Sequence, residues 1–378
     1  MRGRMWERGV ASHGEPRNGW RRRLIMALCL SAGIALLGYN LVPTPARAAL
    51  AVSPATTPTP TTGASAASTD DPFATGQPMA HYLGKPDSWE WRSALPGARI
   101  ILYFGIAGTP AGGVIGWYGN DEAGLLNQLR NQGQGYAQVD PSHPVMMGLD
   151  LVNPLADALP QQGYYIDRMD PSIIQHYADL AHDNHMLFFM DMQIEKSTVQ
   201  RELAYILPYL QLPWVDIALD PEWDHAFGGQ EAGCNVGFDP NITGRTRVSE
   251  INYLIDQLSA LVVSKHLPPK ILIIHQYQFG ENPANRGYIC SNAMPSEGWQ
   301  NIVFKPGVQI VVNTDGVGGP EAKTADYIAF DHDQHIQYPG IKLYYYYPIL
   351  TPNFYDTPLM SPAQVLSLDP PPLLIMYQ

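Results

Sequence analysis

Eight short apolar runs alternate with longer amphipathic stretches between residue 99 and residue 378. Each run is almost continuously hydrophobic and rich in Ile, Val, Leu, Phe or Tyr, as strands buried on both faces of a parallel sheet are. The runs are Arg99–Gly105, Val145–Leu151, Met186–Met192, Trp214–Leu219, Lys270–Gln276, Val308–Asn313, Lys342–Tyr347 and Leu373–Gln378.

Helical patterns separate most of these runs. The predicted helices are Asp121–Gln132, Pro171–Asn184, Ser197–Leu210 and Val248–His266. Asp170 is an expected N-cap, because Pro171 follows it at the first helical position. Eight strands with helices between them, over about 300 residues, predict an α/β fold of the (β/α)8 TIM-barrel class.

An open, doubly wound sheet is the competing architecture. It requires a glycine-rich phosphate turn after the first strand that leads directly into a helix. Residues 105–113 are glycine-rich, but they contain Pro110 and precede no immediate helical pattern. We interpret them as a loop that lets the backbone approach a ligand, or as a simple connection.

The segment before the barrel has two parts. Residues 1–48 have a basic region, an apolar run over 24–38 and Ala46-Arg47-Ala48, as a secretory signal peptide does. The run is shorter than the roughly 20 residues of a membrane span, but it could extend to 42, so a signal anchor over 24–42 stays open. Residues 49–76 are rich in Pro, Thr, Ala and Ser and predict a disordered linker to a barrel domain over 77–378. We therefore expect a secreted or extracellular protein that is either free or membrane-anchored.

Charge restricts the partners. The chain has 23 basic and 35 acidic residues, and without residues 1–48, which hold eight Arg and two Glu, the formal net charge is −18. So acidic a surface repels nucleic acid and anionic lipid, whereas polysaccharides and other neutral polymers incur no such penalty. Cys234 and Cys290 remain after the predicted signal segment, and in an exported chain they are expected to form a disulfide.

The fourth strand ends in acidic residues. Side chains alternate along a strand, so Asp216, Ala218, Asp220 and Glu222 would share one face, with the last two roughly 7 Å apart. Mutual repulsion between two such carboxyls raises one pKa and leaves the other group ionised, which suits an acid/base pair. The plain alternative is a strand that turns polar as it reaches solvent.

Other polar and aromatic side chains occur where the remaining strands end. In a TIM barrel the active site lies at the carboxyl ends of the strands. Amides and acids bind sugar hydroxyls there, and aromatic rings stack on sugar rings. The candidate substrate-binding residues are Asp150, Asp191, Gln193, Trp223, Gln276, Tyr277, Asn313, Asp315, Tyr345 and Tyr347. Each of them, taken alone, could instead simply cap a strand.

No cofactor and no metal site are expected. The segment Asp331-His332-Asp333-Gln334-His335 contains metal-ligating residue types, but it is charged and precedes the seventh strand, so we interpret it as a solvated surface. His275 on the fifth strand could act in a site, although a histidine satisfied in the core is more common.

The segment Asp216–Glu222 resembles a degenerate form of the fourth-strand signature of family 18 chitinase-like glycoside hydrolases, Asp-Gly-x-Asp-x-Asp-x-Glu. The resemblance implies that Glu222 is the proton donor and that Asp220 orients the acetamido group of the substrate. The chain departs from the signature where Val215, Asp216 and Ala218 replace Asp, Gly and Asp. The Asp-x-Glu ending also resembles family 25 lysozymes.

Two functions follow from this sequence. The first is an exported glycoside hydrolase for a neutral or N-acetylated polysaccharide, for example in a cell wall. The second is a non-catalytic carbohydrate-binding or wall-associated barrel, which the alanine at position 218 favours. The seventh run contains no carboxylate that could be a nucleophile, so hydrolysis would use assistance by a substrate N-acetyl group, or inversion with Asp191 or Asp315 as base.

Overall fold

The computed structural model describes residues 94–156, 164–224, 246–277, 301–332, 337–348 and 355–378. Eight parallel strands form a closed barrel in the order β1-β10-β9-β8-β7-β6-β5-β2, so neighbours in the barrel follow one another along the chain. The strands are β1 (Arg99–Gly105), β2 (Val145–Val152), β5 (Leu187–Met192), β6 (Val215–Leu219), β7 (Lys270–Tyr277), β8 (Val308–Asp315), β9 (Tyr338–Leu343) and β10 (Leu374–Tyr377). The predicted (β/α)8 barrel is confirmed.

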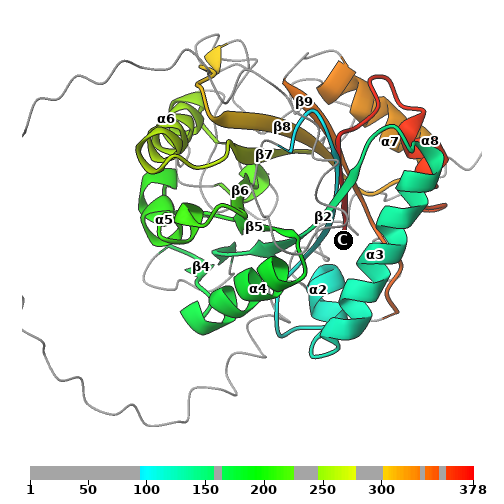
Figure 1. Cartoon of the computed structure of the whole chain (residues 1–378), viewed down its shortest axis with the longest axis horizontal. Helices are drawn as coiled ribbons and strands as arrows, with labels where there is room; N and C mark the ends of the chain where they lie inside the picture. Colours follow the sequence, from blue (N-terminus) through cyan, green and yellow to red (C-terminus); the bar gives the residue numbers. More distant parts are fainter. Residues whose placement is uncertain (1–93, 157–163, 225–245, 278–300, 333–336, 349–354) are drawn as a thin grey trace, which may run out of the picture.

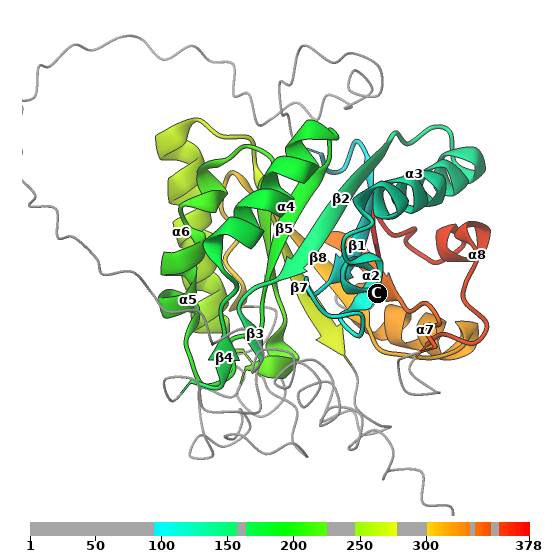
Figure 2. The same ribbon diagram turned by 90° about the horizontal axis from the view of Figure 1, so that it is seen from below.

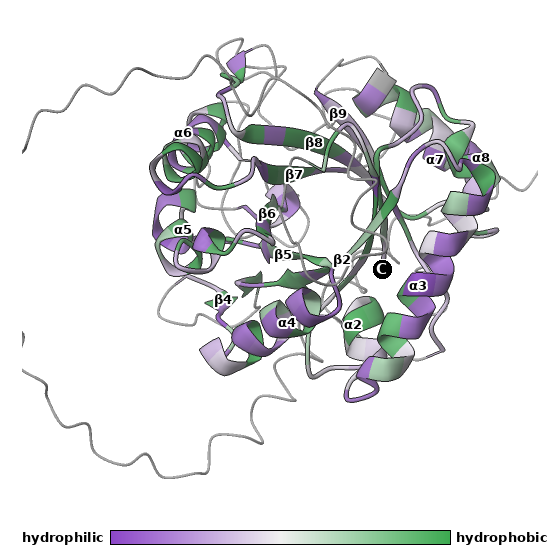
Figure 3. Ribbon diagram, viewed as in Figure 1, coloured by the Kyte–Doolittle hydropathy of each residue, from purple (hydrophilic) through white to green (hydrophobic). Residues whose placement is uncertain are grey.

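Helices surround this ring, as Figure 1 shows in a view along the barrel. They are α2 (Gly113–Tyr118), α3 (Glu122–Val139), α4 (Pro171–Asp183), α5 (Val199–Ile206), α6 (Val248–Lys265), α7 (Pro320–Tyr327) and α8 (Pro362–Leu366). The expected cap of α4 is present, since the Asp170 side chain accepts a hydrogen bond from the Ser172 amide. Figure 3 shows hydrophobic and hydrophilic residues on different faces of helices such as α4 and α6, as amphipathic helices packed on a sheet require. None of the helices in the described ranges is both long and apolar enough to cross a membrane.

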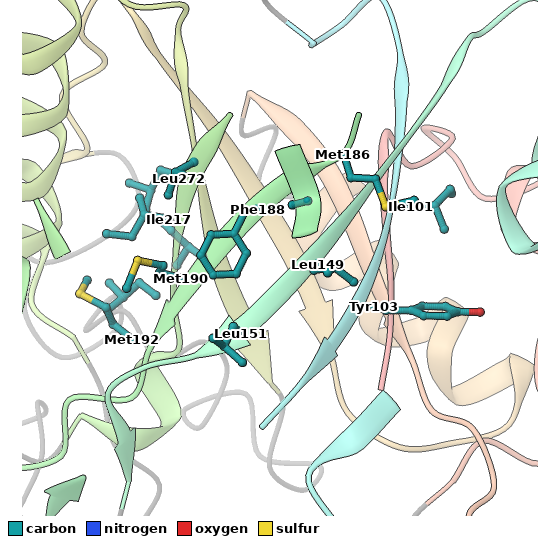
Figure 4. Packing of buried hydrophobic residues seen from close by; sticks show 14 of the residues in the cluster. Ile101, Tyr103, Leu149, Leu151, Met186, Phe188, Met190, Met192, Ile217 and Leu272 are labelled. Atoms are coloured by element: carbon teal, nitrogen blue, oxygen red, sulfur yellow. The ribbon is translucent and has the colours of Figure 1, made fainter. Parts of the chain in front are cut away.

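Alternation along the strands creates two apolar cores. In β1, Ile100, Leu102 and Phe104 point into the barrel, whereas Ile101 and Tyr103 point towards the helices. Figure 4 shows part of the outer core, where Phe188 and Met190 from β5 lie near Leu149 and Leu151 from β2. Burying one such aliphatic or aromatic side chain contributes about 1.5–3 kcal/mol.

The amino-terminal end of the barrel is filled. Leu95 packs into the inner core, and its carbonyl accepts a hydrogen bond of 2.7 Å from the Gln309 amide. The ammonium group of Lys270 donates to the carbonyls of Leu212 (2.8 Å) and Val215 (2.6 Å). A ligand must therefore approach from the carboxyl ends of the strands, the side on which β3 (Leu155–Ala156) and β4 (Ile166–Asp167) lie in Figure 2.

Two element predictions are wrong. The seventh barrel strand covers 338–343 rather than 342–347, because Pro339 and Gly340 hide its beginning and the tyrosine-rich run leaves the ladder, with the Tyr344 amide donating to Asp356 Oδ2. A helix, α2, does follow the glycine-rich segment directly. A side chain at Gly105 would lie 2.3 Å from the Gly112 carbonyl oxygen, so this glycine permits the close approach of the loop to β1.

The predicted signal segment, the linker, Cys234 and Cys290 lie outside the described residues. The expected cleavage or anchoring and the expected disulfide therefore stay predictions.

Candidate active site

Polar side chains fill the inside of the barrel at the carboxyl ends of the strands. They follow the apolar inner layer because inward-facing residues recur at every second position of a strand. The buried members are Asp150 on β2, Asp191 on β5, Asp220 after β6, His275 on β7, Asn313 and Asp315 on β8, and Lys342 on β9. Charges so far from water require close partners.

Asp315 is the centre of a hydrogen-bond network. Its Oδ2 lies 3.1 Å from His275 Nδ1 and 3.1 Å from Lys342 Nζ. Its Oδ1 accepts hydrogen bonds from the Tyr344 hydroxyl and from the Gly316 amide, the latter at 2.6 Å. Burial opposes the charge, but Lys342 and the hydrogen bonds from His275 and Tyr344 outweigh it and hold the pKa of Asp315 well below its usual range. Asp315 is therefore ionised, and all four of its acceptor positions are used.

Glu222 is in the opposite electrostatic state. It lies in a short 3-10 helix, Pro221–Trp223, and is half-buried. Although part of the residue reaches solvent, desolvation by the surrounding barrel mouth raises the pKa of its carboxyl, and the negative charges of Asp220 and Asp315 raise it further, well above the usual range. Glu222 therefore keeps its proton to a higher pH than an ordinary glutamate.

Asp220 connects Glu222 to the barrel wall. Its Oδ2 accepts a hydrogen bond of 3.3 Å from Gln193 Nε2, and the Gln193 Oε1 accepts one of 3.2 Å from the Ala156 amide, which fixes the orientation of that side-chain amide. Burial raises the pKa of Asp220, and the nearby cations His275 and Lys342 counteract this rise. Asp220 can therefore change protonation state more easily than Asp315.

Asp150, Asp191 and His275 form a compact group beside this network. One ligand-type atom from each of the three lies within 4.8 Å of the others, and all three side chains are fully buried. His275 Nε2 is 3.5 Å from Asp191 Oδ2 without forming a hydrogen bond. Burial raises the pKa of Asp150 to about 7 and that of Asp191 well above its usual range. This group is the one in the described part of the chain whose donor types could hold a metal ion.

No family model matches the chain, and no curated protein matches it. Among solved structures, one similar chain is a mannanase of Bacillus subtilis, which is 9% identical with a TM-score of 0.28. The match covers 63% of this chain and 80% of the mannanase. The likeness concerns the fold and says nothing about the site residues of this chain. The resemblance to family 18 has no support among these matches.

The structure brings most of the predicted residues to the barrel mouth. Those whose side chains enter it or border it are Asp150, Asp191, Gln193, Asp220, Glu222, Trp223, Asn313 and Asp315. The position of Glu222 differs from the expectation, because β6 ends at Leu219 and the chain turns into the 3-10 helix at Pro221. The turn, and not a continued strand, brings Glu222 close to Asp220.

Three predicted substrate-binding residues do not enter the mouth. The Tyr345 hydroxyl donates to Gln132 Oε1 of α3 at 2.8 Å, and its ring stacks on Tyr377 at 5.0 Å in the outer core. Tyr347 also belongs to the outer core, and Gln276 lies on the face of β7 opposite to His275. The reason for the error is the shifted seventh strand, and at Gln276 the alternation of β7. The side chain of Tyr277 is outside the described part of the chain.

The interpretation of Asp331 as solvated surface is wrong. Asp331 is buried and accepts a hydrogen bond of 2.6 Å from the Thr314 hydroxyl. It supports β8 and β9 from outside the barrel, since its other oxygen accepts the Gly340 amide at 3.4 Å. Residues 333–336 lie outside the described ranges.

Sequence reasoning missed Lys342 and Tyr344, which hold Asp315. A signal for Lys342 was present, because a lysine inside an apolar strand is unusual unless it has a charged partner. Tyr344 could have been distinguished from Tyr345 only with the correct start of β9, since the inward or outward direction follows from the register of the strand.

Proposed function

We propose that this protein is an exported glycoside hydrolase that acts on a neutral or N-acetylated polysaccharide, with Glu222 as general acid and Asp220 as its partner. The observation that supports this most is the opposed ionisation of two carboxyls in one barrel mouth. Glu222 retains a proton, whereas Asp315 is held as a carboxylate. Environments that separate two pKa values in this way distinguish an acid from an electrostatic stabiliser.

Glu222 suits proton donation because it is accessible and protonated. A glycosidic oxygen must receive a proton as its bond to the sugar breaks, and the donor must lie where a polymer can reach it. Glu222 is half-buried, whereas Asp150, Asp191 and Asp220 are almost completely buried. Among the described carboxyls of the mouth, Glu222 is therefore the best placed to meet a glycosidic bond.

The geometry favours assistance by the substrate over inversion. Asp315 is a poor base, because His275, Lys342, Tyr344 and Gly316 already occupy its oxygens. Asp191, the other candidate base, has no exposed surface on which a water and a sugar could meet. An N-acetyl group of the substrate would supply the nucleophile instead, and Asp220 would orient it. This favours an N-acetylated polysaccharide.

A non-catalytic carbohydrate-binding barrel remains the second candidate, and one observation favours it. Ala218 faces the inside of the barrel between its strand partners Asp191 and Ile273. A carboxylate at this position would add a third acidic group below Asp220 and help to tune its proton affinity. Without it, Asp220 depends on Gln193 for orientation.

The test compares the purified full-length protein with Glu222→Gln on chitin oligosaccharides, peptidoglycan and mixed glucans. Turnover in the wild type that falls by about 10²–10⁴-fold in the variant, with sugar binding unchanged, supports the proposal. Glu321→Gln is the matched control, because Glu321 is exposed in the first turn of α7, and it should retain full activity.

Two outcomes would overturn the proposal. Equal sugar binding by wild type and Glu222→Gln without turnover in either would favour the binding barrel. Turnover that survives in Glu222→Gln would exclude Glu222 as the general acid.

A further inference from the structure

We propose that Asp150, Asp191 and His275 bind one divalent transition-metal cation of the Mn²⁺ or Zn²⁺ class inside the barrel. The site would connect β2, β5 and β7 at the level of the polar layer. This inference goes beyond the proposed glycoside hydrolysis and does not depend on it.

The three donor atoms are close enough to share one ion. One carboxylate oxygen from each aspartate and one imidazole nitrogen lie within 4.8 Å of one another. Ligands about 2.0–2.2 Å from a common metal are separated by about 3–4 Å, so a small contraction would complete the coordination. The side chains come from three rigid barrel strands, which suits a preformed site.

The polar atoms of this group have no other partner. Among the described residues, no donor forms a hydrogen bond to either oxygen of Asp150, to either oxygen of Asp191, or to Nε2 of His275. All three side chains are at most 1% exposed. Buried polar groups almost always have partners, because an unpaired one costs about 1–3 kcal/mol and a charged one costs more. Five unpartnered atoms that meet at one place indicate a ligand with positive charge.

His275 presents the correct nitrogen to this place. Ionised Asp315 can only accept a hydrogen bond, so the proton of the imidazole lies on Nδ1, 3.1 Å from Asp315 Oδ2. The other nitrogen, Nε2, then carries the lone pair and faces Asp191. A carboxylate that fixes the tautomer of a histidine in this manner is the usual second partner of a metal-binding imidazole.

The surrounding charge permits a cation. Lys342 lies near Asp150 and Asp191, but its ammonium group pairs with Asp315 at 3.1 Å and lies 3.7 Å from the centroid of the Phe104 ring. Asp315 thus neutralises Lys342, and Asp150 and Asp191 are left to balance a divalent ion. Two carboxylates with one imidazole suit Mn²⁺ and Zn²⁺, whereas Mg²⁺ and Ca²⁺ prefer oxygen ligands alone.

A shared proton is the competing explanation. Two neighbouring carboxyls in a dry site can hold one proton between them, and burial does raise the pKa of both aspartates here. A shared proton would leave His275 Nε2 without a partner, whereas a cation would satisfy all three side chains.

The experiment titrates chelator-treated, full-length protein with Mn²⁺ and follows free Mn²⁺ by electron paramagnetic resonance. We expect one bound Mn²⁺ per chain, displaced by Zn²⁺, with affinity lowered more than about 100-fold in Asp150→Asn and in Asp191→Asn. Asp256→Asn is the control, since Asp256 is an exposed aspartate that pairs with Lys305 on the surface, and it should bind as the wild type does.

Circular dichroism confirms that each variant is folded, and His275→Gln replaces any variant that is not. Thermal unfolding gives a second readout, because Mn²⁺ should raise the Tm of the wild type and of Asp256→Asn but not of Asp150→Asn. The absence of saturable binding to the wild type would overturn the proposal and favour the shared proton. Binding that Asp150→Asn and Asp191→Asn leave unchanged would also overturn it. Both readouts measure occupancy, so they are independent of whether the protein hydrolyses any glycoside.

Discussion

The ammonium group of Lys342 lies 3.1 Å from Oδ2 of Asp315, and both side chains are almost completely buried. This pair joins β8 to β9 at the point where the barrel opens. Because His275 and Tyr344 also contact Asp315, the orientation of the polar layer depends on this one carboxylate.

Replacement of Asp315 by Asn should therefore be strongly destabilising. The amide keeps the shape but leaves Lys342 as an uncompensated buried charge, and breaking such a pair costs about 3–5 kcal/mol. Urea denaturation of Asp315→Asn should show a loss of this size in the free energy of unfolding. Asp256→Asn, which breaks an exposed pair with Lys305, should change it by about 1 kcal/mol or less. Similar losses in both variants would contradict the role given to Asp315.

The two adjacent tyrosines provide a test of the register of β9. Tyr344 donates to Asp315 inside the barrel, whereas Tyr345 donates to Gln132 outside it. Both Tyr344→Phe and Tyr345→Phe remove a buried hydrogen bond, so each should lower stability by about 1–3 kcal/mol. Only Tyr344→Phe should also lower kcat, because only it changes the electrostatics of the site. A loss of kcat confined to Tyr345→Phe would show that the strand is misplaced.

The raised pKa of Glu222 predicts the direction of the pH dependence. Burial and the charges of Asp220 and Asp315 keep Glu222 protonated above the usual range of a glutamate. The protonated form is the one that donates, so kcat/KM should be maintained at low pH on this account and fall as the pH rises through the pKa of Glu222. A pH profile on a soluble oligosaccharide tests this. Activity that increases steadily towards alkaline pH would contradict a general acid at this position.

Asp216, at the closed end of the barrel, predicts a pH effect on stability that is separate from the site. Burial raises its pKa to about 6, although nearby Lys270 and a hydrogen bond from the Ile271 amide counteract the rise. The folded state then holds more protons than the unfolded state between about pH 4 and pH 6, so the contribution of Asp216 to stability falls as the pH rises through this window.

Asp216→Asn removes this contribution. A shift of about two units corresponds to roughly 3 kcal/mol, so the variant should gain on the order of that amount relative to the wild type between pH 4 and pH 7. Urea denaturation of both proteins at the two pH values measures the change. A difference that stays constant with pH would show that Asp216 ionises normally in the folded state.

The barrel could be predicted from the sequence because its strands are buried on both faces. Continuous apolar runs such as 99–105 and 270–276 then identify strands without any need for alternation, and the observed strands match them closely. The seventh strand was misplaced for a physical reason. Its first residues include Pro339 and Gly340, which are rare inside strands, and the β-favouring tyrosines follow it instead.

The site could be predicted only in part. The rule that function lies at the carboxyl ends of barrel strands correctly indicated Asp150, Asp191 and Asp315. Sequence order does not show which of these side chains meet, because their contacts join strands far apart in the chain. The pairing of Lys342 with Asp315 and the grouping of Asp150 with Asp191 and His275 depend on closure of the barrel.

The most direct test of Glu222 as general acid compares two kinds of leaving group. A dinitrophenyl glycoside departs without a proton, whereas a sugar leaving group requires one. Glu222→Gln should lose about 10²–10⁴-fold in kcat/KM on the N-acetylated oligosaccharide and retain nearly wild-type kcat/KM on the corresponding dinitrophenyl glycoside. Equal losses on both substrates, or no loss on either, would contradict the assignment of Glu222 as the proton donor.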